Sequence, residues 1–102
     1  MAEFYDALET RDPAARERDL LARLPRHVEH AQKNAAGFAR ILKGIDSREI
    51  VSRAALAKLP VTRKSDLKAL QAEIRPLGGL NATPVEKLAK IFSSPGPIYE
   101  PE

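Results

Sequence analysis

The sequence of 102 residues contains no cysteine and no tryptophan. The absence of cysteine excludes disulfide bonds and thiolate metal sites. Phenylalanine and tyrosine together make up 5% of the residues, so a core has to be built from Leu, Ile, Val and Ala. This composition favours helices over a sheet sandwich, and the length allows one small domain at most.

Long apolar runs are also absent. No stretch approaches the roughly 20 apolar residues that a membrane-spanning helix needs. Residues 1–6 lack the basic start and the apolar stretch of a signal peptide. We therefore expect a cytoplasmic protein without a membrane partner.

The sequence has no long run of residues with the same charge. The net charge is +3, from 17 basic and 14 acidic residues, and the two signs alternate, as in RERD at residues 16–19. Mixed signs at this spacing are typical of a solvated helix face. They favour a protein without a nucleic-acid partner over one with a basic binding patch.

Helix signals dominate the first half of the chain. Asp12-Pro13 predicts a helix start, because Asp is a good N-cap and Pro at the first position loses no needed donor. Behind it the apolar residues recur at steps of three and four, and the pattern extends to Lys43, with Gly44 as the C-cap glycine. Pro25 inside this stripe predicts a kink or a tight break. The stripe consists of Leu20, Leu21, Leu24, Val28, Ala31 and Ala35.

Shorter elements follow. Asp46 caps a single turn, Ser52 caps a helix over 53–59, and Thr62 caps a helix over 63–73. Thr83-Pro84 starts another short helix. Residues 89–93 are predicted to be extended, and three prolines within 94–102 disfavour both a helix and a central strand.

The predicted fold class is mainly α: a small helical segment with room for one short β-strand near the C-terminus. A lone strand lacks backbone partners within a finished fold. We therefore expect the strand to pair between chains or with residues beyond 102.

A family resemblance extends over most of the chain. The sequence LAKLPVTRKSDL at residues 56–67 resembles the L-x-x-L-P-x-T-x-K-x-D-L signature found early in phenylacetate-CoA ligase-like enzymes of the adenylate-forming superfamily. HAQ at 30–32 with FARIL at 38–42, PLGGL at 76–80 and IFSS at 91–94 resemble flanking segments of the same enzymes in the same order. The resemblance covers roughly residues 10–102, and its order and spacing are more specific than any one piece.

The resemblance implies that the chain is the N-terminal segment of a ligase several hundred residues long. Such enzymes activate a carboxylic acid with ATP, form an acyl-adenylate, release pyrophosphate and pass the acyl group to coenzyme A. ATP and coenzyme A are then the cofactors of the parent enzyme, whereas the isolated chain needs no cofactor and is inactive. Its partner is the remainder of the ligase, and exposed apolar faces favour self-association.

The implied domain plan has three parts. An N-terminal arm spans residues 1–11 and a helical subdomain spans 12–88. Residues 89–102 form a strand and a Pro/Gly-rich loop that leads into an adenylate-forming domain missing from this chain.

The family's phosphate loop reads like S-S-G-T-T-G-x-P, and the matching stretch here is SSPGPIYEP at residues 93–101. The resemblance implies phosphate contacts for Ser93, Ser94 and Gly96. The paired threonines are absent, two prolines remove backbone donors, and Glu100 adds negative charge. A purely structural turn is therefore the alternative.

Two other functions stay open. Helices at 53–59 and 63–73 separated by a short turn resemble a helix-turn-helix DNA-binding module, although the turn lacks the usual glycine. The second alternative function is that of a stand-alone helical interaction domain. His27 and His30 share a helix face but lack further ligands at metal-site spacing, and no catalytic group is recognised.

Overall fold

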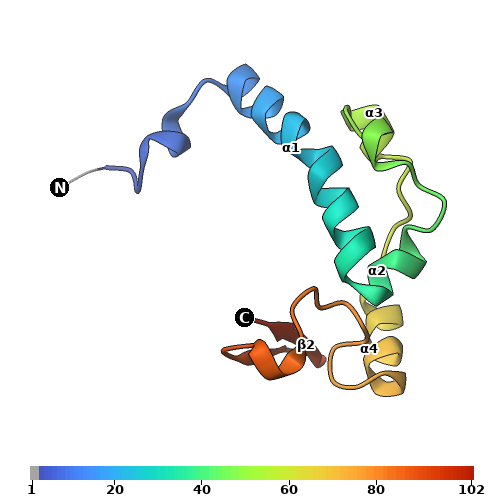
Figure 1. The fold of residues 1–102 in the computed structure, drawn as a ribbon. Helices are drawn as coiled ribbons and strands as arrows, with labels where there is room; N and C mark the ends of the chain where they lie inside the picture. Colours follow the sequence, from blue (N-terminus) through green and yellow to red (C-terminus); the bar gives the residue numbers. More distant parts are fainter. Residues whose placement is uncertain (1–2) are drawn as a thin grey trace.

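The structure, a computed structural model that describes residues 3–102, is mainly helical (Figure 1). Met1 and Ala2 lie outside the described residues, and with them the start of the predicted arm and of the stretch examined for a signal peptide. The α-helices are α1 (Pro13–Asn34), α2 (Ala36–Ile41), α3 (Arg53–Leu56) and α4 (Lys64–Glu73). Three 3-10 helices are η1 (Ala7–Thr10), η2 (Ser47–Glu49) and η3 (Val85–Lys87), and the strands are β1 (Ile91–Ser94) and β2 (Ile98–Pro101).

The molecule is an open crescent built on α1. In Figure 1, α3 lies beside the first half of α1, while α4 and the hairpin lie beyond its C-terminal end. The radius of gyration is 16.3 Å, whereas a compact domain of this length has about 13 Å. The elements therefore enclose only part of the surface that a compact fold of 102 residues would bury.

The start of α1 confirms the predicted cap. The Asp12 carboxylate accepts a hydrogen bond from the Ala15 N–H at 3.0 Å, and Pro13 occupies the first turn. The helix continues through Pro25 as one element. The interruption falls instead at Ala35, whose backbone is extended at φ −122° and ψ 109°.

This interruption has a tertiary cause. The Gly37 N–H donates to the Gly79 carbonyl at 2.7 Å, across 42 positions of sequence. A Cβ on Gly37 would lie 2.9 Å from the Gly78 oxygen. A side-chain-free position at the start of α2 therefore lets the 78–79 loop touch the helix backbone. The helical pattern predicted as far as Lys43 is divided for this reason.

A small apolar cluster joins α1, α2 and the segment around η2. Its buried members are Val28, Leu42 and Ile50. The Gln32 side chain donates to the carbonyls of Leu42 at 3.1 Å and Ile45 at 2.9 Å, which fastens the end of α2 to α1. Partly buried residues surround the cluster: Leu24, Ala31, Phe38, Ile41, Ile45, Ala55 and Leu59.

The strand prediction is corrected by the hairpin. β1 is where a strand was expected, but its partner is β2, in antiparallel register from Ile91 opposite Pro101 to Ser94 opposite Ile98. Gly96 makes the reversal possible with φ +96°, a conformation that favours glycine. The prolines are tolerated because β2 is an edge strand of a two-stranded sheet.

Of the predicted N-caps after Asp12, two are confirmed and two are wrong. Asp46 caps η2, and the Ser52 hydroxyl accepts from the Ala55 N–H at 3.1 Å at the start of α3. α4 begins at Lys64 without a side-chain cap from Thr62. η3 likewise begins after Pro84 without one from Thr83, and α3 ends at Leu56 rather than at residue 59.

Candidate functional site

The three residues matched to the phosphate loop lie together at the hairpin turn. Ser93 and Ser94 end β1, and Gly96 is the residue that reverses the chain. The Ser94 hydroxyl donates to the Ile98 carbonyl at 3.3 Å, so it is engaged within the turn. Ser93 is exposed.

A cation lies against this turn. The Lys64 ammonium group, at the first position of α4, donates to the Pro95 carbonyl. Its Nζ would lie 3.2 Å from a Cβ built on Gly96. Lys64 was not among the predicted site residues, although it is the Lys of the 56–67 signature. The negative charge expected from Glu100 is displaced from the turn, because Glu100 pairs with Phe92 further along the strands.

A second side chain of α4 fixes the hairpin. The Gln71 amide donates to the Tyr99 carbonyl at 2.9 Å and accepts from the Tyr99 N–H at 2.8 Å. Gln71 is 5% exposed, so both bonds are shielded from water. Lys64 and Gln71 are seven residues apart and share one face of α4, because seven residues make close to two helical turns. One face of α4 therefore holds the hairpin at two points.

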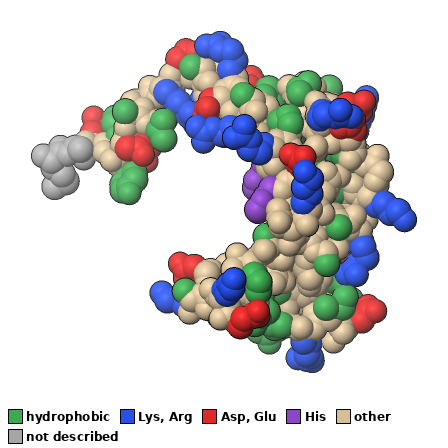
Figure 2. Space-filling view, viewed as in Figure 1, with side chains coloured by type: hydrophobic (Ala, Val, Ile, Leu, Met, Phe, Trp, Pro, Cys, Tyr) green, Lys and Arg blue, Asp and Glu red, His purple; other side chains and the backbone are tan. Residues whose placement is uncertain are grey.

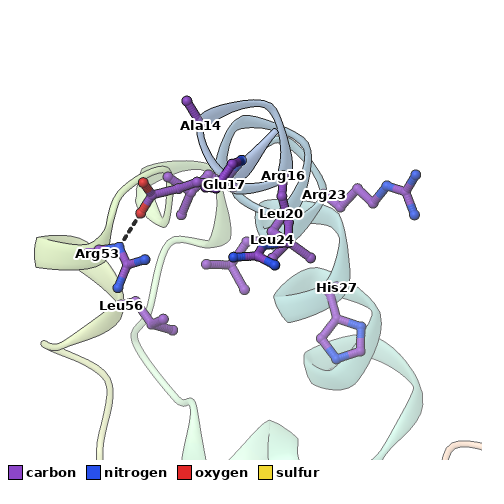
Figure 3. Close-up of a pocket in the computed structure, with 11 residues that line it drawn as sticks. Ala14, Arg16, Glu17, Leu20, Arg23, Leu24, His27, Arg53 and Leu56 are labelled. Carbon is purple, nitrogen blue, oxygen red and sulfur yellow. Dashed lines mark hydrogen bonds and ion pairs between the residues drawn. The ribbon is translucent and has the colours of Figure 1, made fainter. Parts of the chain in front are cut away.

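A large groove lies between α1 and α3. It encloses about 780 Å³ and has an apolar floor and a charged rim. Figure 3 shows Glu17 of α1 reaching Arg53 of α3, with Leu20 and Leu24 lying between the helices. The Glu17 carboxylate raises the pKa of the Arg53 guanidinium. The lining residues are Pro13, Ala14, Arg16, Glu17, Leu20, Leu21, Arg23, Leu24, His27, Arg53 and Leu56.

An ion pair joins the N-terminal arm to α1. Arg11 Nη1 lies 2.9 Å from Asp19 Oδ2, and Arg23 lies 3.2 Å from the other oxygen of the same carboxylate. The Arg11 hydrogen bond holds the pKa of Asp19 below its ordinary value. Because the folded pKa is the lower one, this pair stabilises the protein above the ordinary carboxyl pKa, and the stabilisation is lost as the pH falls through the folded value.

The two histidines lie on the hollow side of the crescent, between the arm and the hairpin (Figure 2). His30 Nδ1 is 3.0 Å from the Asn34 side-chain amide one helical turn away. Within residues 3–102, no three His, Asp or Glu side chains gather closely enough to hold a metal ion. In the same range, no helix combines the length and the apolar character needed to cross a bilayer.

The helix-turn-helix alternative requires two helices packed across a tight turn. α3 is a single turn beside the first half of α1, and α4 lies beyond the other end of α1 (Figure 1). The described residues therefore do not place these two helices as a DNA-binding pair.

Comparison with known proteins gives one structural match. No protein-family model and no curated protein sequence matches this chain. The fold is similar to part of a solved structure, the open conformation of 2-hydroxyisobutyryl-CoA ligase in complex with 2-HIB-AMP and CoA, with a TM-score of 0.75 and 26% sequence identity. The match covers 85% of this chain and 20% of that chain. The chain thus spans about a fifth of an acyl-CoA ligase whose fold it shares over that part.

Proposed function

We propose that this chain is the N-terminal segment of an ATP-dependent acyl-CoA ligase. The similarity in fold to 2-hydroxyisobutyryl-CoA ligase carries the proposal. The signature at residues 56–67 supports it independently, because its Lys64 contacts the turn that resembles the family's phosphate loop. In this role the helices support the substrate-binding domain and α4 presents the loop.

The parent reaction has two steps. A carboxylate oxygen attacks the α-phosphorus of ATP, which releases pyrophosphate and leaves an acyl-adenylate. The thiolate of coenzyme A then attacks the acyl carbon, forming a thioester and releasing AMP. The segment is proposed to position the loop, with the groups that carry out both steps in the remainder of the ligase.

The exposed surface supports a covering partner. The accessible surface is 7927 Å², against about 5,700 Å² for a compact monomer of this mass. Part of this additional accessible surface lies on the hairpin, where Ile91 is 42% and Phe92 49% exposed. A two-stranded sheet is marginal by itself, and the remainder of the ligase is the proposed partner on this face.

The residues of the acid pocket are proposed to lie in the remainder of the enzyme. The family that the signature at residues 56–67 resembles is named for its action on phenylacetate. The structural neighbour, by its name, acts on 2-hydroxyisobutyrate. Both acids therefore belong in the first substrate panel.

A chimera tests the proposal. The aligned part of this chain replaces the matching fifth of 2-hydroxyisobutyryl-CoA ligase, and a deletion variant lacks that fifth. We expect the chimera to retain measurable thioester formation, reduced in rate, whereas the deletion variant has none. A folded chimera as inactive as the deletion variant would refute the segment role.

The same chimera tests the phosphate loop separately. If Ser93 and Ser94 contact ATP phosphates, Ser93→Ala and Ser94→Ala should raise KM for ATP several-fold with little change in folding. An unchanged KM would leave Ser93, Ser94 and Gly96 as a structural turn, without affecting the proposed place of the segment in a ligase.

A further inference from the structure

The described part of the N-terminal arm, residues 3–10, carries exposed apolar side chains that alternate with acidic ones. Phe4 is 50%, Tyr5 91% and Leu8 60% exposed. The acidic residues Glu3, Asp6 and Glu9 are interleaved with them. Figure 1 shows the arm projecting from the start of α1 to the side opposite α3. Half or more of the surface of each of these large side chains is therefore left exposed within residues 3–102.

The arm has internal order despite this exposure. Glu9 accepts a hydrogen bond from the Tyr5 N–H at 2.6 Å, and Asp6 accepts one from the Leu8 N–H at 2.9 Å. These bonds hold the segment in one shape, so less conformational entropy is lost when it docks.

The groove between α1 and α3 has the complementary character. On its floor, Leu20 is 55% and Leu56 43% exposed. Three arginines and one glutamate line it. Arg16 forms no ion pair with any residue in 3–102. Arg23 and Arg53 are already paired with Asp19 and Glu17, so Arg16 is the groove cation available to a docked segment. Its charge beside an apolar floor matches an apolar segment that carries carboxylates.

The lengths also agree. The groove follows α1 from Pro13 to His27, about 21 Å at the rise of an α-helix. The eight described arm residues, 3–10, are four bend residues and the four residues of η1, and even with residues 3–6 fully extended they would reach no further than about 21 Å, so they fit within this length.

The arm is directed away from the groove of its own chain. The Arg11–Asp19 ion pair and the Asp12 cap fix the chain direction immediately before α1. Asp19 is not a groove residue, so this pair holds the base of the arm outside the groove.

We propose that the arm of a second copy of this chain occupies the groove, reciprocally, in a two-fold dimer. Both the arm and the groove belong to the N-terminal end of α1, so a two-fold axis near Pro13 brings each arm to the partner's groove. Such an exchange closes on itself and forms no open chain of copies. It is independent of the proposed ligase role.

Sedimentation of complementary variants tests the exchange. Phe4→Ser with Leu8→Ser removes the apolar arm contacts and leaves the groove intact. Leu20→Glu places a carboxylate in the groove and leaves the arm intact. We expect the unmodified chain to be a dimer at tens of micromolar, each variant alone to be a monomer, and their equimolar mixture to form a heterodimer with one arm–groove contact.

Controls separate docking from misfolding. Val61→Ser changes an 85% exposed residue outside both surfaces and should leave the dimer unchanged. Each variant should keep the helical circular dichroism of the unmodified chain. Raising the salt concentration should weaken the dimer, because exposed charges are screened. A monomeric unmodified chain, a dimeric arm variant, or a mixture without heterodimer would each overturn the proposal.

Discussion

Replacing Gly37 by alanine is expected to lower the free energy of unfolding by about 3 kcal/mol, the upper part of the range for overpacking a closed contact. The added Cβ would meet the Gly78 oxygen at 2.9 Å and the Gly79 carbonyl carbon at 3.0 Å. Both are backbone atoms, so no side chain can move aside. The 78–79 loop must separate from α2, and the hydrogen bond from Gly37 to Gly79 is lost with it.

Urea denaturation of the Gly37→Ala variant measures this effect. Gly44→Ala is the matched comparison, because Gly44 has φ +81° but an added Cβ there meets nothing within 4 Å. It should cost about 1 kcal/mol from backbone strain alone. Equal losses at the two positions would mean that the contact of α2 with the loop does not stabilise the fold.

Replacing Gln71 by leucine is expected to release the hairpin from α4. The change removes the amide N–H that donates to the Tyr99 carbonyl and the amide oxygen that accepts from the Tyr99 N–H. It leaves an apolar side chain of similar size. An unsatisfied buried polar group costs about 1–3 kcal/mol. Detachment of the hairpin lets water satisfy both Tyr99 groups, so local opening should become about 2 kcal/mol easier.

Amide hydrogen exchange at Tyr99 reports this opening. A change of about 2 kcal/mol corresponds to roughly 30-fold faster exchange. Gln32→Leu is the control, because Gln32 also makes two side-chain hydrogen bonds to backbone groups, but they join α1 to Leu42 and Ile45 and not α4 to the hairpin. The Gln32 variant should leave the amide exchange rate of Tyr99 unchanged. Identical Tyr99 exchange in the Gln71 variant would show that the hairpin is held by other contacts.

The features that the sequence predicted well are local. Asp12 with Ala15, and Ser52 with Ala55, are hydrogen-bonded pairs three residues apart, so the residues that decide the helix start lie in one short window. The mainly helical class follows from the same windows together with the lack of aromatic residues. The strand at 91–94 could also be predicted locally, because its apolar residues precede a Pro/Gly turn.

The features that the sequence did not predict depend on distant residues. The interruption at Ala35 depends on Gly79, and the pairing of β2 depends on Gln71, 28 residues before Tyr99. Propensity gave Thr62 and Thr83 as caps, yet neither supplies a side-chain cap. In the candidate site, Ser93, Ser94 and Gly96 were named from a resemblance, while Lys64 was recognised only when the fold placed it beside Pro95.

The central claim is that these 102 residues are the front of a larger ligase. Intact-mass spectrometry of the polypeptide captured from its source cells with an antibody against α4 tests this claim most directly. The account predicts a chain several times longer, consistent with the fifth of the ligase structure that this segment matches. A captured polypeptide with only the mass of the 102 residues would contradict it.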